Sequence, residues 1–272
     1  MRLIKINSDG SFSLTRFTAN IPSYAILSHT WEEDDQEVTF QDFIKSVGSS
    51  KRGWKKIKFC GKQAQKDDLF YFWVDSCCID QSSSAEISTA VNSMFDWYQN
   101  AAKCYVYLSD VSTGVPRAES ERPQARPLAF VRDKWPTKGR ILQEFLQSRW
   151  FTRGWTLQEL LVPESVEFFS KEGEQLGDKV SLEHEIGQIT GIPILALRGD
   201  QLSHFSIEER MSWIRNRETT IEEDAVYSLF GIFDIHMPLI YGEGAVNALR
   251  RLGEEIEKSF SINKYGKPYY FI

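Results

Sequence analysis

The sequence predicts an α/β protein: a parallel sheet flanked by helices, with an N-terminal β-hairpin and a helical C-terminal extension. Three short apolar runs, at 24–27, 70–74 and 105–108, show no polar alternation, which is typical of strands covered on both faces. Segments with helical periodicity lie between these runs. Alternating strands and helices favour a parallel sheet with helical crossovers.

The N-terminal hairpin is expected within residues 1–20. Residues 3–6 and 12–17 alternate with a period of two, and Asp9-Gly10 between them suits a tight turn. A weaker apolar run at 165–169 predicts a further strand.

Helices are predicted from apolar stripes and capping signals. Residues 55–65 give a modest signal, and Ser83 with Glu86 forms a predicted capping box before a stronger stripe. The members of that stripe are Ile87, Val91, Met94, Phe95 and Tyr98.

The segment after residue 170 is expected to be helical. One stripe ends at Gly191, and a last helix is expected around 245–256. Two more capping boxes, Ser206 with Glu209 and Thr220 with Glu223, predict two helices between them.

These patterns divide a single domain of 272 residues into segments. The hairpin (1–20) precedes an α/β core (21–170), and a helical extension (171–262) follows. The core contains a proline-rich, charged insertion (111–138) that we expect to be mobile and outside the packed interior. Residues 263–272 are expected to be a tail or the start of a linker.

Composition narrows the classes of function. The net charge of −6 argues against a general nucleic-acid binder and an anionic-membrane binder. No signal peptide and no apolar run of about 18 residues is found, so no membrane span is expected. The four cysteines form no Cys-x-x-Cys pair, so neither a disulfide framework nor a metal site is expected. This use of cysteine is typical of a reducing compartment, and we expect a cytoplasmic location.

Polar residues follow all three strong apolar runs. These are Ser28-His29, Asp75-Ser76 and Ser109-Asp110. Ligands of open parallel sheets bind at the carboxyl ends of the strands, so we expect these residues at one edge, around a crevice. The plainer alternative is that loops are polar wherever strands end.

A second candidate is the segment 155–161. On a helix, its three leucines share one face, while Trp155 and Glu159 lie together on the opposite face. The pair either lines a pocket, with the carboxylate as its polar anchor, or is a half-buried tryptophan beside a solvated charge.

Two further features are less specific. Trp31 either stacks on a planar ligand or caps the core, and His29 is either a site residue or structural. Cys77 and Cys78 are adjacent, so on a strand their side chains would point to opposite faces. Buried thiols without a chemical role are favoured over a nucleophilic Cys78.

Three sequence segments, which occur in the order 24–31, 72–81 and 153–160, resemble the signature motifs of the fungal heterokaryon-incompatibility (HET) domain. Residues 217–229 and 237–244 are similar to that family as well, so the likeness covers nearly the whole chain.

This resemblance implies a TIR-like, flavodoxin-like fold and a cell-death effector of fungal innate immunity. It implies self-association, receptor domains of a larger NLR-like protein as partners, and NAD as substrate with no cofactor. The family pattern has glycine where this chain has Glu32. Glu159 matches the catalytic glutamate that TIR enzymes carry after a tryptophan on the helix following the third strand.

The resemblance also assigns the site. Glu159 would stabilise an oxocarbenium-like state as nicotinamide leaves NAD. The remaining substrate-binding residues would be Ser28, His29, Trp31, Asp75, Cys78, Arg153 and Trp155. Arg153 either neutralises phosphate or forms a salt bridge at a helix start. The alternative function is a non-catalytic oligomerising signalling module.

Overall fold

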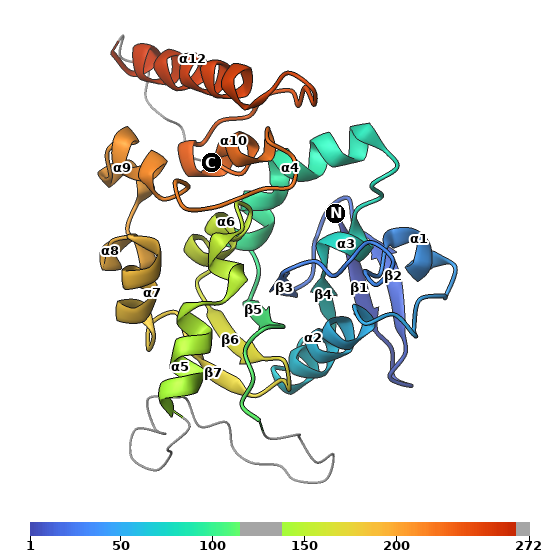
Figure 1. Cartoon of the computed structure of the whole chain (residues 1–272). Helices are drawn as coiled ribbons and strands as arrows, with labels where there is room; N and C mark the ends of the chain where they lie inside the picture. The colour runs from blue at the N-terminus through green and yellow to red at the C-terminus, as the bar shows by residue number, and fades with distance from the viewer. Residues whose placement is uncertain (115–137, 265–272) are drawn as a thin grey trace.

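The computed structural model describes residues 1–114 and 138–264, in which seven strands form one sheet in the order β2-β1-β4-β3-β5-β6-β7 (Figure 1). Strands β4, β3, β5 and β6 run parallel, whereas β1, β2 and β7 extend the sheet with antiparallel pairings. The strands are β1 (Arg2–Ile6), β2 (Phe12–Arg16), β3 (Ala25–His29), β4 (Tyr71–Trp73), β5 (Lys103–Leu108), β6 (Val166–Ser170) and β7 (Gln175–Asp178).

The four parallel strands lie in the order second, first, third, fourth along the chain. This is the order in which a flavodoxin-like sheet begins, and it confirms the predicted fold class. The strand order reverses between β3 and β5, and ligands of such sheets bind at this switch point. All five side chains of β3 are buried, as expected of a central strand.

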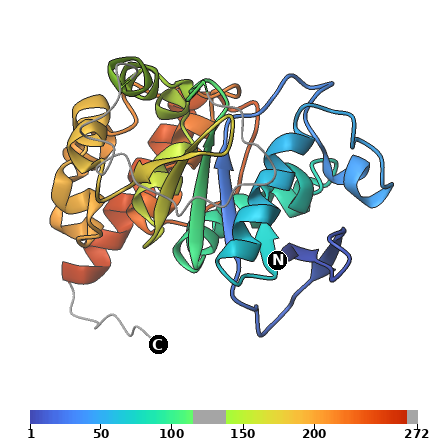
Figure 2. The same cartoon turned by 90° about the horizontal axis from the view of Figure 1, so that it is seen from below.

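Helices cover both faces of the sheet (Figure 2). On one face, Phe59 of α2 (Trp54–Lys66) packs on Tyr107 and Phe169. On the other, Trp150 packs on Phe168, and α6 (Thr156–Leu161) contacts both β3 and α4 (Ser84–Gln99). Ser28 is therefore on the α6 side, in register with Val106.

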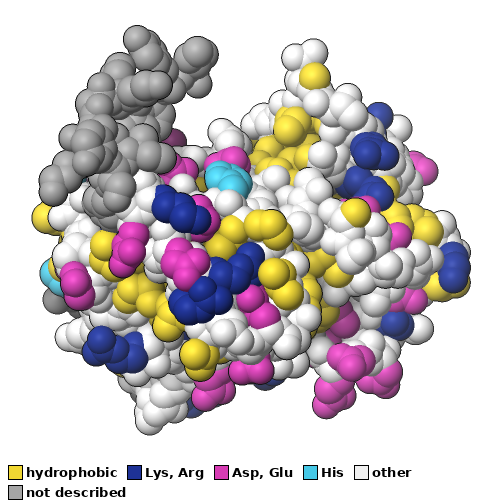
Figure 3. Space-filling view, turned by 90° about the horizontal axis from the view of Figure 1, so that it is seen from above, with side chains coloured by type: hydrophobic (Ala, Val, Ile, Leu, Met, Phe, Trp, Pro, Cys, Tyr) yellow, Lys and Arg dark blue, Asp and Glu magenta, His cyan; other side chains and the backbone are white. Residues whose placement is uncertain are grey.

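Shorter helices complete the described chain. They are α1 (Phe40–Ile44), α3 (Asp75–Cys78), α5 (Lys138–Leu146), η2 (Arg149–Thr152), α7 (Glu183–Thr190), α8 (Ile194–Leu197), η3 (Leu202–His204), α9 (Ile207–Ser212), α10 (Asp224–Tyr227) and α11 (Phe230–Phe233). The longest described helix, α12 (Ala245–Lys264), follows them. On the face seen from above, where α12 lies, acidic, basic and hydrophobic side chains are intermingled (Figure 3). Within the described residues, no helix is long and apolar enough to cross a membrane.

Several predicted elements are confirmed. The hairpin, the fourth strand and the helices at 54–66 and 84–99 are present, and Gly191 ends α7 with a left-handed φ of 69°. Ser206 caps α9 by accepting from the Glu209 amide. Ser83 caps α4 similarly, but the Glu86 carboxylate binds Arg2 and the Asp80 amide, so the reciprocal half of that box is missing.

Other expectations were wrong. The segment after residue 170 is not purely helical, because β7 extends the sheet. Thr220 does not cap a helix, because Glu223 is the N-cap of α10 and its carboxylate accepts from the amides of Gly242 and Gly244. Cys77 and Cys78 lie on α3 and not on a strand.

The expected insertion is also narrower than 111–138. Val111 is fully buried, the Ser112 amide donates to Glu144, and α5 already begins at Lys138. Residues 115–137, to which the expectation of mobility mostly applies, lie outside the described residues. Of the expected tail, residues 263–264 belong to α12, and 265–272 lie outside the described residues.

Candidate functional site

The ends of β3, β4 and β5 meet at one edge of the sheet, as the sequence predicts. Thr30 Oγ1 and Ser109 Oγ are 3.4 Å apart, and His29 Nε2 lies 2.8 Å from Asp75 Oδ1. This edge includes the switch point between β3 and β5. The structure thus brings together the polar residues that follow all three strong apolar runs.

Asp75 is the centre of a tight polar group at the end of β4. Its Oδ2 accepts from Trp31 Nε1 at 2.6 Å, and its Oδ1 accepts from the Ser76 amide at 2.7 Å. Burial alone would raise the pKa of Asp75, but the charge and hydrogen bond of His29, with the Trp31 hydrogen bond, hold that pKa below its usual value. Asp75 therefore stays ionised and fixes the Trp31 ring, which is 42% exposed.

Glu159 lies on α6, where its carboxylate reaches Ser28 at the end of β3. Ser28 Oγ donates to Glu159 Oε2, and Ser28 Oγ also accepts from Trp150 Nε1 at 2.8 Å. Tyr98 of α4 donates to the Leu27 carbonyl and interacts with the Glu159 carboxylate. Strand β3 and helices α4 and α6 thus converge on one carboxylate.

Glu159 is not the solvated helix charge that the plainer alternative for this segment proposed. Its residue exposure is 7%, and all six residues of α6 are buried. Burial raises the pKa of Glu159 to about 7, and the nearby Asp75 charge adds to the rise, whereas the hydrogen bonds of Ser28 and Tyr98 and the His29 charge oppose it. The carboxyl group therefore titrates near neutral pH.

Two buried cations hold the ends of α6. Arg217 donates from Nη1 to the Arg153 carbonyl at 2.9 Å and to Thr156 Oγ1 at 2.7 Å. Lys179 donates from Nζ to the carbonyls of Leu161 and Pro163, at 3.2 and 2.7 Å. Lys179 lies at the carbonyl end of α6, where unpaired C=O groups accumulate and a cation is favoured, whereas Arg217 holds the opposite end by direct hydrogen bonds.

Sequence reasoning missed both cations. Arg217 is the first residue of the segment 217–229, which is similar to the HET family, so this similarity could have indicated its importance. Nothing local marked Lys179. Burial lowers the pKa of Lys179 to about 8 and that of Arg217 to about 10, which reflects how completely both side chains leave solvent.

Three expected substrate-binding residues lie elsewhere or are engaged. Trp155 Nε1 donates to Asp224 at 3.2 Å, so the two residues expected to act together, Trp155 and Glu159, contact different elements. Arg153 donates to Thr220 Oγ1 at 3.2 Å. Cys78 is buried, and desolvation raises the pKa of its thiol to about 12, which opposes nucleophilic chemistry.

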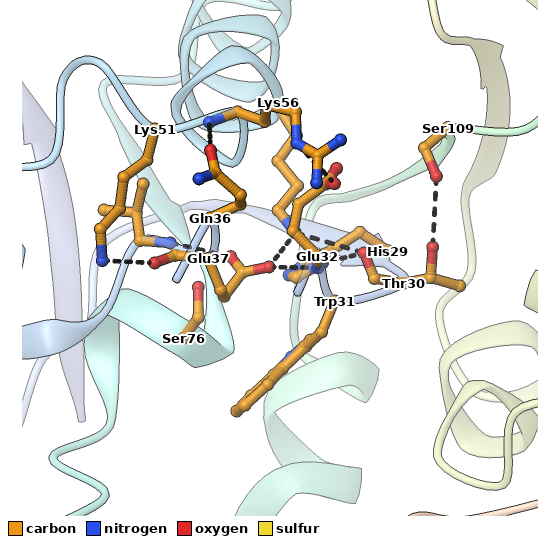
Figure 4. A network of polar contacts seen from close by, with 12 residues as sticks. His29, Thr30, Trp31, Glu32, Gln36, Glu37, Lys51, Lys56, Ser76 and Ser109 are labelled. Carbon is orange, nitrogen blue, oxygen red and sulfur yellow. Dashed lines mark hydrogen bonds and ion pairs between the residues drawn. The ribbon is translucent and has the colours of Figure 1, made fainter. Parts of the chain in front are cut away.

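The loop after β3 is fixed by a buried ion pair (Figure 4). Lys56 of α2 pairs with Glu37, and Lys56 Nζ also donates to the Thr30 carbonyl at 3.2 Å. The other contact of Glu37 Oε2 is the Glu32 amide, at 2.8 Å. Glu32 does not have a positive φ, so the position needs no glycine. Among the described residues, no group of three His, Cys, Asp or Glu side chains could hold a metal ion.

The fold and this edge define an α/β domain of flavodoxin-like order with a buried, titrating carboxylate beside its switch point. The family model described as "Heterokaryon incompatibility protein (HET)" matches residues 24–159, half of the chain, and the chain belongs to this family. The vegetative incompatibility protein HET-E-1 of Podospora anserina is 51% identical over 260 residues, which cover 95% of this chain and 18% of that relative. The chain thus spans less than a fifth of that relative's length. No solved structure gives a significant match.

Proposed function

We propose that the domain is the cell-death effector of an incompatibility system and that it hydrolyses NAD when it assembles. The reaction adds water across the nicotinamide–ribose bond and gives nicotinamide, ADP-ribose and a proton. The name of HET-E-1, a vegetative incompatibility protein, supports the biological part of the proposal.

One observation carries the enzymatic part. A buried carboxylate with a pKa raised to about 7 lies beside the switch point of a flavodoxin-like sheet. Strongly perturbed carboxyl groups are concentrated at functional sites, and ligands of such sheets bind at this edge. Glu159 combines both properties, and His29, Asp75 and Trp31 supply further polar and aromatic groups along the same edge.

The proposed chemistry requires the ionised form of Glu159. Nicotinamide leaves as a neutral ring, so its departure needs little help from an acid. The ribose carbon meanwhile gains positive charge, which a nearby carboxylate stabilises. In a site from which water is excluded, that attraction is larger than in solvent.

The burial of Glu159 gives the proposal its regulatory part. Glu159 as a residue is only 7% exposed, so its carboxylate has little access to a dinucleotide, and the resting domain is expected to be inactive. Assembly would open the space between β3 and α6. The attraction between the ionised Glu159 carboxylate and the substrate would offset the free-energy cost of burying that charge, and this would favour the open form. Raising the local concentration of neighbouring domains would then act as the switch.

One observation favours the alternative, a non-catalytic signalling module. The Glu159 carboxylate has hydrogen-bonding partners in Ser28 and Tyr98, as a purely structural residue would. The two proposals differ in their product. The purified domain, with and without forced clustering on a fused oligomerisation tag, is incubated with NAD while free nicotinamide is measured. Nicotinamide release that depends on clustering supports the hydrolase, and its absence in both samples supports the module.

A further inference from the structure

A pocket lies on the opposite side of the sheet from Glu159. This pocket, of about 450 Å³, is formed between the first turns of α2 and the segments that follow β3, β5 and β6. Volumes of this order are typical of small-molecule sites. Six of its lining side chains are cationic, and we call it the basic pocket: Lys51, Arg52, Lys55, Lys56, Lys58 and Lys171.

Three of the six cations are already neutralised. Lys51 pairs with Asp42, Arg52 with Glu33, and Lys56 with Glu37. The other three, Lys55, Lys58 and Lys171, are exposed, and within the described part of the chain no carboxylate pairs with them.

The charge of the pocket contrasts with that of the whole chain. Counting the three paired carboxylates and Glu32, which also lines the pocket, four negative charges face six positive ones. The whole chain has a net charge of −6, and the face around α12 mixes both signs. A concave surface with unpaired lysines attracts anions, because the walls focus the field of the charges.

Position and shape narrow the class of anion. Lys55 and Lys58 are three residues apart on α2 and share a face, and Lys171 approaches from the end of β6. Trp54, whose ring also packs on Phe12 and Phe43, and the largely buried Tyr107 contribute aromatic surface to the lining. Ser109 at the end of β5 adds a hydroxyl at the switch-point edge. Multiple ammonium groups suit adjacent phosphates, and an aromatic wall suits a planar base.

The basic pocket is separate from the environment of Glu159. Tyr107, which lines it, faces α2 through its contact with Phe59, whereas Ser28 faces α6 and binds Glu159. Successive residues of a strand point to opposite faces, so Tyr107 and the Ser28 side chain lie on different sides of the sheet.

We propose that the basic pocket binds a nucleoside diphosphate, with Lys55, Lys58 and Lys171 holding the diphosphate and Trp54 flanking the base. This binding does not depend on NAD cleavage and goes beyond the proposed function. The same chemical group is present in free ADP and in the ADP half of a dinucleotide, so the experiment includes both.

The test is calorimetric titration of the whole domain with ADP at low ionic strength. The variant combines Lys55→Gln, Lys58→Gln and Lys171→Gln, which remove three charges from exposed positions. The matched control is Lys62→Gln, an exposed lysine on the same helix that does not line the pocket. Circular dichroism establishes that both variants fold.

We expect ADP to bind the wild type and the control equally, and the triple variant about tenfold or more weakly, with binding that weakens as salt is added. Inorganic pyrophosphate should compete with ADP, and adenosine should bind more weakly. NAD that displaces ADP would mark the pocket as part of a dinucleotide site, whereas simultaneous binding would mark a separate nucleotide site. The proposal is overturned if ADP does not bind, or if the triple variant binds it as the wild type does.

Discussion

Replacing Glu159 with glutamine should change how stability depends on pH. Burial raises the pKa of Glu159 from 4.5 to about 7, so between these values the folded state holds a proton that the unfolded chain releases. Stability from this group is fully present below about pH 4.5 and is lost as the pH rises through 7. Glutamine keeps the size of the side chain and an oxygen that accepts from Ser28, but it does not titrate.

The size of the effect follows from the two pKa values. A shift of about 2.5 pKa units corresponds to about 3 kcal/mol between the protonated and ionised forms. Between pH 5 and pH 8, most of this difference develops, about 2 to 3 kcal/mol. The residue is buried on all sides, so solvent does not screen the effect in the way it screens surface charges.

The assay is urea unfolding of the wild type and Glu159→Gln at pH 5 and at pH 8. We expect the stability of the wild type relative to the variant to fall by about 2 to 3 kcal/mol across this interval. Glu208→Gln, at an exposed position on α9, is the control and should follow the wild type at both values. Parallel pH profiles for the wild type and Glu159→Gln would refute the argument that Glu159 is buried and protonated near neutrality.

Further predictions concern α6, the thiols and assembly. Arg217→Met should lower the free energy of unfolding by about 1 to 3 kcal/mol, because it removes the hydrogen-bond donors of the Arg153 carbonyl and Thr156 Oγ1. Denaturant unfolding measures this loss, and an unchanged midpoint would count against a stabilising role for these hydrogen bonds. Lys179→Met should cost a similar amount by leaving carbonyls at the end of α6 unpaired, and a wild-type midpoint would argue that water replaces the ammonium. Cys78, buried with its thiol pKa raised to about 12, should react with a thiol reagent only after denaturation, and rapid labelling of the native domain would contradict its burial. Dilution should abolish NAD cleavage by the assembled domain without changing its circular dichroism, whereas a specific activity independent of concentration would exclude an assembly switch.

Much of the fold could be predicted because its signals are local. Fully apolar runs identified β3, β4 and β5, and the polar residues after them identified the edge where His29, Asp75 and Ser109 meet. Strand β7 gave no such signal. It has four residues, with polar ends and a glycine inside, and it forms because β6 offers an unpaired edge.

The environment of Glu159 could not be predicted from its own helix. A helical wheel places Glu159 opposite the leucines of α6, but the whole of this short helix is enclosed, and Ser28 lies 131 residues away in sequence. Arg217 reaches α6 from more than 60 residues away. The capping box expected at Thr220 failed for the same reason, since Glu223 instead binds amides near residue 243.

The claim that Glu159 is a catalytic carboxylate is tested most directly by nicotinamide release from NAD by the clustered domain, wild type against Glu159→Gln. Both proteins are compared at equal concentration, after circular dichroism and urea unfolding have established that the variant is folded. We expect the wild type to release nicotinamide and the folded variant to do so about a hundred-fold or more slowly, because it lacks the charge that stabilises the ribose cation. A folded, clustered Glu159→Gln domain that cleaves NAD at the wild-type rate would contradict the claim.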